Sequence, residues 1–297
     1  MAELIRAPGD EAVAVGRCTA LVLVLASLAG VVMFCWPLFV RVPAESVGHT
    51  TDAPLVFALV LPFVVAIVLA SMTEGGMDSK ALAMLGVLSA VNAALRPLGA
   101  GLAGIETVFF VLVLAGRVFG PGFGFALGCT SVFASALLTA GVGPWLPFQM
   151  VASAWIGLGA GLLPRRVSGR AEIAMLVGYG VFAAYFFGFV MNLWFWPYAV
   201  GPGTDVSFVA GDPMLENLQR YVVFTFTTSS LGWDTGRAVT NALAILALGP
   251  AVLATLRRAS RRASFGVAVT FAPTPTEAEG LPRYRGSQLG TETNPGR

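Results

Sequence analysis

Long apolar runs, joined by short polar or glycine- and proline-containing links, make up most of the chain. A helix of roughly 20 apolar residues crosses the hydrocarbon core of a bilayer. The pattern predicts eight such helices, at Cys18–Val40, Pro54–Met72, Ala81–Arg96, Glu106–Phe119, Gly122–Ala140, Pro147–Leu163, Glu172–Trp196 and Gly236–Leu256. We therefore predict an all-α fold, a polytopic helical bundle in a membrane.

The links between the runs differ in charge. The links on one side, and the start of the region after the last run, carry nine of the 18 basic residues, namely Lys80, Arg117, Arg165, Arg166, Arg170, Arg257, Arg258, Arg261 and Arg262. Cytoplasmic loops of membrane proteins carry an excess of Lys and Arg. This asymmetry predicts an even number of spans in the cell membrane, with both termini in the cytoplasm.

Two segments depart from the simple pattern of runs and links. Leu218–Ser230 is apolar and precedes the last run, so it is either a lid helix or the outer part of a long last span. Arg257–Arg297 lacks the apolar residues that a core needs, and we predict a disordered cytoplasmic tail there.

The composition agrees with a membrane protein and offers little chemistry for catalysis. Of the 297 residues, 56% are hydrophobic and 11% are charged, which leaves no separate soluble domain. The three cysteines lack metal-binding spacing and His49 is the only histidine, so we predict neither a metal site nor a cofactor. No nucleophile, zinc or phosphate-binding motif occurs in a suitable context. We therefore expect neither enzymatic activity nor ATP hydrolysis by this chain.

Charged residues at the facing ends of the third and fourth runs are candidates for a binding site. Arg96 ends the third run, Asn92 precedes it by one turn on the same face, and Glu106 opens the fourth run. A charge at membrane depth costs about 2.5 kcal/mol or more, and it tends to mark a partner or a substrate path. Arg96 and Glu106 therefore pair with each other, or Arg96 binds a polar substrate group. Alternatively, both side chains simply reach the membrane interface.

Aromatic and amide side chains gather at the outer ends of the later runs. Trp145 and Gln149 are four residues apart, and a ring beside an amide suits a flat ligand that forms hydrogen bonds. Asn192 lies deeper than the aromatic residues that end the seventh run. Tryptophan is also common at membrane interfaces as an anchor, so Trp145 has that simpler interpretation as well.

The start of the last run combines an aromatic residue with an acid and a base. Trp233 and Asp234 precede Arg237 and Asn241, and helical spacing places Asp234 one turn from Arg237. These residues form either a structural ion pair that holds the last helix or one wall of a ligand pocket with Trp233 against the ligand.

Two stretches resemble a known family. Met77-Asp78-Ser79-Lys80 leads into a helix rich in Ala and Gly, and Gly143-Pro144-Trp145-Leu146-Pro147-Phe148-Gln149-Met150 follows the glycine-containing stretch Gly122–Gly128. Both are similar to the substrate-binding S components of energy-coupling-factor (ECF) vitamin transporters. The resemblance covers roughly Met77–Leu256.

The resemblance implies a six-helix core that holds a vitamin or a vitamin precursor near the outer face. It implies three parts: residues 1–76 with two extra transmembrane helices, 77–256 as the substrate-binding core, and 257–297 as the tail. A transmembrane coupling (T) protein and two ABC ATPases would drive uptake. The extra amino-terminal helices are most similar to actinobacterial members assigned to cobalamin. The expected partners are thus the coupling subunits, a vitamin-like molecule and the lipid bilayer, with no nucleic acid.

Small residues recur on the first helix of this core. Gly86, Ala90 and Ala94 are four residues apart and share one helix face. In the family that the chain resembles, such a face slides against the coupling protein. Small residues also serve ordinary packing between membrane helices, so both interpretations stand.

Two other classes of function compete with substrate capture. A membrane-embedded enzyme that acts on a lipid-linked substrate would need acid and base residues at the inner or central level, and few occur there. A structural scaffold would have no use for polar residues on the outer side. The grouping of Asn92, Arg96, Gln149, Asn192 and Trp233 on that side favours substrate capture.

Overall fold

The computed structural model describes residues 13, 15–39, 58, 62, 66, 69–70, 73, 77–99, 105–199, 203–209 and 211–263. Its α-helices are α1 (Arg17–Phe39), α3 (Ser79–Leu95), α4 (Val108–Phe119), α5 (Pro121–Leu138), α6 (Leu146–Leu162), α7 (Gly169–Ala199), α8 (Met214–Thr225) and α9 (Thr235–Ala263). A 3-10 turn, η1 (Arg96–Gly99), follows α3, and a π-helix, η2 (Phe226–Asp234), joins α8 to α9. No strand occurs among these residues, so the predicted all-α fold is confirmed.

Several helices are long and apolar enough to cross a membrane. α1, α5, α7 and the continuous helix from Met214 to Arg261 meet both conditions. α3, α4 and α6 are apolar but shorter, with 17, 12 and 17 residues. The predicted span Pro54–Met72 lies almost entirely outside the described residues, so the total of eight spans stays a prediction.

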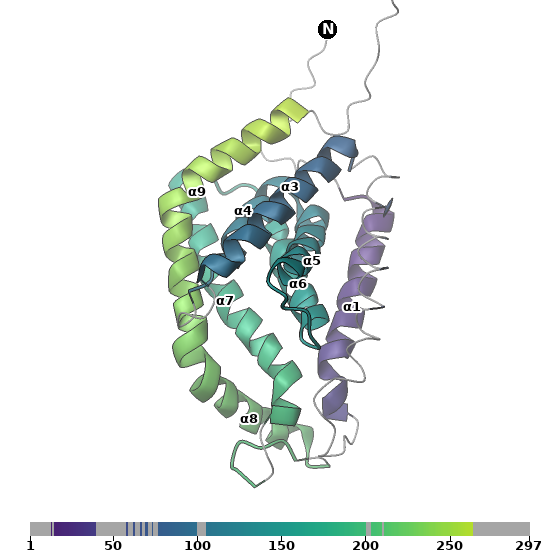
Figure 1. The fold of residues 1–297 in the computed structure, drawn as a ribbon, viewed down its shortest axis with the longest axis vertical. Coiled ribbons are helices and arrows are strands. Elements are labelled where there is room, and N and C mark those ends of the chain that lie inside the picture. Colours follow the sequence, from purple (N-terminus) through teal and green to yellow (C-terminus); the bar gives the residue numbers. More distant parts are fainter. Residues whose placement is uncertain are drawn as a thin grey trace, which may run out of the picture. The chain divides into compact units, whose positions relative to one another are not determined.

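Helix α4 lies at the centre of the bundle. All of its residues are buried, and it packs against α3, α5, α6, α7 and α9. Figure 1 shows α4 behind α3, with α7 and α9 close to it. An apolar helix in a membrane can face lipid, so this complete burial means that neighbouring helices cover α4 on every side.

Close backbone contact joins α5 to α6. Gly124 of α5 lies against Gly157 of α6, and a Cβ atom on either residue would come closer than 3.0 Å to the carbonyl group of the other. Small residues allow such an approach where lipid supplies no hydrophobic driving force between helices. Glycine is required at both positions because a larger residue would separate the two backbones.

Helix α1 packs against the predicted core. The ring of Phe34 lies 5.3 Å from that of Phe148 and 5.7 Å from that of Trp155, both on α6. α1 also contacts α5 and α7. The first of the two predicted extra helices is therefore held by aromatic packing on the helices that follow.

Local sequence signals set two helix ends. The side chain of Asp78 caps α3 by accepting a hydrogen bond from the Ala81 amide at 2.8 Å. Gly120 has a φ of 103° between α4 and α5, a conformation that glycine adopts without strain. Pro121 then starts α5, where its fixed φ suits the first turn.

The last helix is longer than the predicted span. α8, η2 and α9 follow one another without a break, so Leu218–Ser230 belongs to this helix and is not a separate lid. α9 continues to Ala263, so the first residues of the predicted disordered tail are helical. Residues 264–297 lie outside the described part of the chain.

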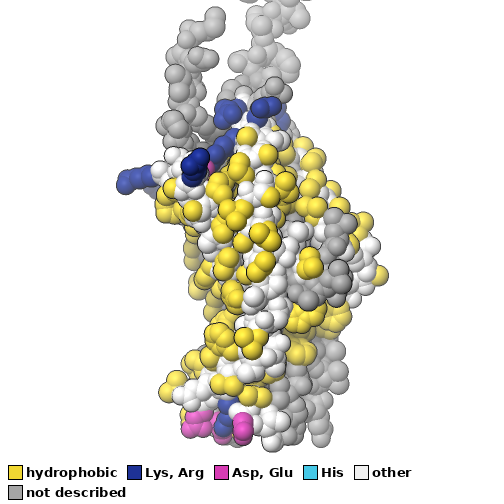
Figure 2. Space-filling view, turned by 90° about the vertical axis from the view of Figure 1, so that its left-hand side faces the viewer, with side chains coloured by type: hydrophobic (Ala, Val, Ile, Leu, Met, Phe, Trp, Pro, Cys, Tyr) yellow, Lys and Arg dark blue, Asp and Glu magenta, His cyan; other side chains and the backbone are white. Residues whose placement is uncertain are grey.

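Basic and acidic side chains gather at opposite ends of the helices. Figure 2 shows Lys and Arg at the end where α9 finishes, and Asp and Glu at the end where α8 lies. At the acidic end, Arg220 bonds to Asp212 at 2.8 Å and lies 3.8 Å from Glu216. This distribution agrees with the charge asymmetry that the links predict.

Candidate functional site

The best candidate site lies where the first turns of α9 meet the residues just before α4. Arg237 donates from Nε to Glu106 Oε2 at 2.6 Å and from Nη1 to Asp234 Oδ1 at 2.9 Å. Asn241 Nδ2 donates to the carbonyl oxygen of Glu106 at 2.8 Å. We call these four residues the Arg237 cluster. The predicted pair of Asp234 and Arg237 is confirmed, and Glu106 joins it from far along the chain.

Three of the four residues of the Arg237 cluster are buried, and Glu106 is partly exposed. Asp234 and Asn241 are fully buried, and Arg237 is 8% exposed. The guanidinium group lies 5.1 Å from the ring centre of Phe187 and 5.9 Å from that of Phe109. Buried ion pairs persist only where their geometry and remaining hydrogen bonds are good, so these contacts fix the side chains in place. The described residues contain no group of three or more His, Cys, Asp or Glu side chains that could hold a metal ion.

The π-helix η2 supplies the hydroxyl groups around Asp234. Ser229 and Ser230 both donate to Asp234 Oδ2, at 3.2 and 3.1 Å. On the opposite side, α7 presents Gly188, where a Cβ atom would come closer than 3.0 Å to the carboxylate. π-helical turns are rare in proteins, and those that do occur are often found at functional sites. Here the π-helix and a glycine together make room for one buried carboxylate.

Arg96 connects α3 to α6. Its Nη2 donates to Gln149 Oε1 at 2.8 Å. Of the alternatives for Arg96, the direct pair with Glu106 is not formed, because Glu106 bonds to Arg237 instead. Arg96 nevertheless lies within electrostatic range of Glu106 and Arg237. Two guanidinium groups and two carboxylates, including Asp234, thus balance each other in this region.

The two other predicted amides lie on α3 and α7. Asn92 is buried and its Nδ2 donates to Ser131 Oγ of α5 at 3.0 Å, so it bonds away from the Arg96 side chain that its spacing suggested. Asn192 is partly buried on α7. Asn92 Oδ1, Asn192 Nδ2 and Asn241 Oδ1 are buried atoms without a hydrogen-bond partner among the described residues. Buried polar atoms are usually bonded, so these three amides are suited to contact a polar ligand or water.

The two predicted tryptophans are largely exposed. Trp145 is 42% exposed, and its Nε1 donates to the Gly141 carbonyl of its own loop at 3.2 Å. Trp233 is 48% exposed. Trp145 therefore turns toward its loop while Gln149 turns to Arg96. Exposure of this kind is typical of aromatic residues at a membrane interface.

A second charged cluster, at the opposite helix ends, was not predicted from the sequence; Arg117 and Glu172 are buried, and Arg257 is partly exposed. Arg117 Nε and Arg257 Nη2 both donate to Glu172 Oε1, at 2.7 and 2.6 Å. The other two nitrogens of Arg117 donate to three carbonyl oxygens of the link between α6 and α7. The available signal was a charge beside an apolar run, which needs a partner when buried. Since these groups satisfy one another, the cluster fits a structural role.

The small residues of α3 lie on an uncovered face. Gly86, Ala90 and Ala94 are all exposed, and a Cβ atom on Gly86 would have nothing within 4 Å. The described residues therefore do not use this face for packing within the bundle.

The sequence of this protein also matches the model of a known family. The family model described as "ECF transporter, substrate-specific component" matches residues 80–256, which is more than half of the chain. The matched region begins at the first turn of α3 and includes the whole Arg237 cluster, together with Arg117 and Glu172. No curated protein and no solved structure matches the chain.

Proposed function

Because the chain belongs to the family of ECF transporter substrate-specific components, we propose that it captures a vitamin or a vitamin precursor at the outer face of the cell membrane. Components of this family work with a membrane-embedded coupling protein and ATPases. We propose that a T protein and two ABC ATPases supply the energy for uptake here. In this scheme the chain binds and releases its substrate without chemical change.

The observation that carries this proposal is the pair of polar contacts at the ends of helices α3, α4, α6 and α9, Arg96 with Gln149 and Arg237 with Glu106. Arg96, Gln149, Glu106 and Arg237 all lie within the region that the family model matches. Polar groups deep in an apolar bundle tend to mark a substrate path. Since the charges of this region balance, it suits a neutral or zwitterionic substrate that binds mainly through hydrogen bonds.

The distribution of charge supports an orientation for the site. We place the basic end of the bundle in the cytoplasm, because positive residues accumulate there in membrane proteins. The Arg237 cluster then lies toward the exterior, and the Arg117–Glu172–Arg257 cluster lies near the cytoplasmic end. The exposed face of Gly86, Ala90 and Ala94 is available to the coupling protein along α3.

Cobalamin is the first candidate among the vitamins. The resemblance to cobalamin-type members rests on long outer loops and on the helix pair that precedes the six-helix core. The packing of α1 against α5, α6 and α7 supports a role for that helix in the same protein unit.

Ligand-dependent thermal stability tests the proposal. The full-length protein in lipid nanodiscs is heated with cobalamin, thiamine, biotin, riboflavin or queuosine. A ligand present at 100 times its Kd stabilises the folded state by about 2.7 kcal/mol, which is readily measured. Gln149→Leu should reduce this stabilisation strongly, whereas Gln219→Leu, the same change at an exposed position of α8, should not. If no compound stabilises the wild-type protein, vitamin capture is refuted.

A further inference from the structure

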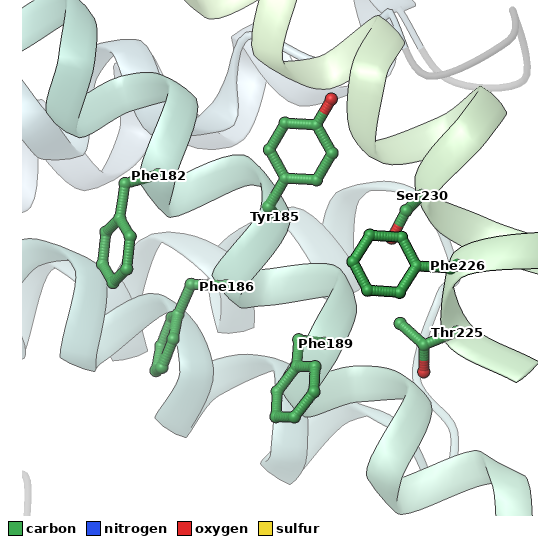
Figure 3. A pocket seen from close by; sticks show the side chains of 7 residues that line it. All are labelled: Phe182, Tyr185, Phe186, Phe189, Thr225, Phe226 and Ser230. Atoms are coloured by element: carbon green, nitrogen blue, oxygen red, sulfur yellow. The ribbon is translucent and has the colours of Figure 1, made fainter. Parts of the chain in front are cut away.

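An apolar groove lies between α7 and the π-helix η2. Its volume is about 280 Å³. Five aromatic rings line it, four from α7 (Phe182, Tyr185, Phe186 and Phe189) and one from η2 (Phe226), and Ser230 also belongs to its wall. Figure 3 shows the α7 rings on one side and Phe226 with Ser230 on the other. The volume is just below the roughly 300 Å³ at which small-molecule pockets begin, so the groove suits one ring system and not a whole large vitamin.

The aromatic rings leave surface available to a ligand. Phe182 and Phe226 are 57% and 60% exposed. Phe182 stacks on Phe186 with ring centres 5.6 Å apart, so the two rings form a continuous aromatic surface along α7. Aromatic rings favour offset-stacked or edge-to-face partners. A flat unsaturated ring therefore gains more binding free energy in this groove than a saturated group of the same size does.

Ser230 connects the groove to the Arg237 cluster. Its hydroxyl donates to Asp234 Oδ2 at 3.1 Å, and Asp234 bonds in turn to Arg237. A serine hydroxyl has one donor and two acceptor positions. Because the carboxylate takes the donor, the Ser230 hydroxyl in the groove wall can serve a ligand only as an acceptor. A ligand that bonds to it must therefore present an N–H or O–H group.

We propose that this groove holds a flat unsaturated ring of the captured substrate, and that Ser230 accepts a hydrogen bond from an N–H or O–H group beside that ring. The inference rests on the proposed function, because the ring belongs to the substrate of the same site. It narrows the substrate class to compounds in which an unsaturated ring carries a neighbouring donor. A lipid acyl chain is the competing occupant, but it offers neither a flat face nor a donor for Ser230.

Two adjacent serines provide a matched test. Ser229→Ala and Ser230→Ala each remove one hydrogen bond to Asp234 Oδ2, but only Ser230 lines the groove. Affinities of the full-length protein in nanodiscs are measured for cobalamin, riboflavin and queuosine, which carry unsaturated rings, and for biotin and pantothenate, which lack aromatic rings. One neutral hydrogen bond corresponds to roughly a 2- to 13-fold change in affinity. Ser230→Ala should therefore weaken binding at least about twofold more than Ser229→Ala.

A second pair of variants tests the aromatic surface. Phe226→Leu removes an exposed ring from the groove, and Phe195→Leu removes a comparably exposed ring of α7 outside it. The loss of one ring contact should weaken binding by roughly 2- to 13-fold in Phe226→Leu, with little change in Phe195→Leu. Phe226→Tyr keeps the ring and should restore the affinity.

The outcomes separate this inference from the function on which it rests. If no vitamin binds the wild-type protein, both fail. If a vitamin binds but Ser230→Ala and Phe226→Leu match their controls, the groove inference alone is overturned. The same holds if biotin or pantothenate is the preferred ligand. Lipid analysis of the purified protein adds a further outcome. Phospholipid that is lost in Phe226→Leu while vitamin affinity stays constant would identify a lipid site and overturn the inference.

Discussion

Replacement of Gly188 by alanine is the sharpest perturbation of the candidate site. Gly188 lies opposite Asp234, and a Cβ atom there would come closer than 3.0 Å to three atoms of the carboxyl group. Real Cβ atoms do not approach other atoms this closely, so either α7 or the Asp234 side chain must move. Because Asp234 also bonds to Arg237, Ser229 and Ser230, its movement disturbs the whole Arg237 cluster.

Gly178→Ala is the matched control for Gly188→Ala. It makes the same change in the same helix, and its Cβ atom would have nothing within 4 Å. Both variants gain up to about 1 kcal/mol of helix propensity, so their difference isolates the steric conflict. Overpacking costs about 1–3 kcal/mol. If the Asp234–Arg237 pair breaks, the penalty rises to about 3–5 kcal/mol.

Thermal unfolding of both variants in detergent measures this difference. For a chain of this size, 1 kcal/mol corresponds to a change of about 2–4 °C in Tm, so Gly188→Ala should unfold at least about 2–4 °C below Gly178→Ala. In an Asp234→Ala background the obstructing carboxylate is absent, and Gly188→Ala should then cost almost nothing. Equal Tm values for the two single variants, or an undiminished penalty in the Asp234→Ala background, would refute the steric argument.

Three further predictions concern other parts of the bundle. Arg117→Met leaves Glu172 without one of its two partners and should destabilise the protein by about 3–5 kcal/mol, whereas the exposed Arg258→Met should change the free energy of unfolding by less than about 0.5 kcal/mol; detergent Tm values compare them. Gly157→Ala forces α6 away from α5 and should cost about 1–3 kcal/mol or more, while Gly86→Ala should be tolerated because its surroundings are open; loss of stability in both would contradict this. Gly86→Phe should abolish ATP-dependent uptake in proteoliposomes containing the coupling subunits while ligand binding persists, and loss of both would indicate a folding defect instead.

The apolar helices were predictable because the features that identify each one lie within its own segment of the sequence. Run length and hydropathy are properties of consecutive residues, as in α1 and α7. The local cap at Asp78 and the Gly120–Pro121 junction are likewise settled by neighbouring residues. The pair of Asp234 and Arg237 was predictable for the same reason, because residues three apart share one helix face.

The partners of isolated charges were not predictable in this way. Glu106 bonds to Arg237 across 131 residues, and Arg96 bonds to Gln149 across 53. From the sequence, a pair of Arg96 and Glu106 was one of the open alternatives, because the two residues flank one short link. The rotation of each helix about its own axis decided otherwise, since it fixes which side chains face each other. The cluster of Arg117, Glu172 and Arg257 escaped notice because its members come from three different helices.

The chain alone thus determined that this protein is a helical membrane bundle with charge separated between its ends, because bilayer thickness and insertion energetics act on each segment individually. Only the tertiary structure decided how the polar groups combine. The π-helix η2 places Ser230 in the wall of the groove, and the absence of a side chain at Gly188 leaves room for the buried carboxylate of Asp234. Which polar side chains meet depends on the distances between helix backbones. These distances are set when the helices pack together, so no single segment of the sequence determines them.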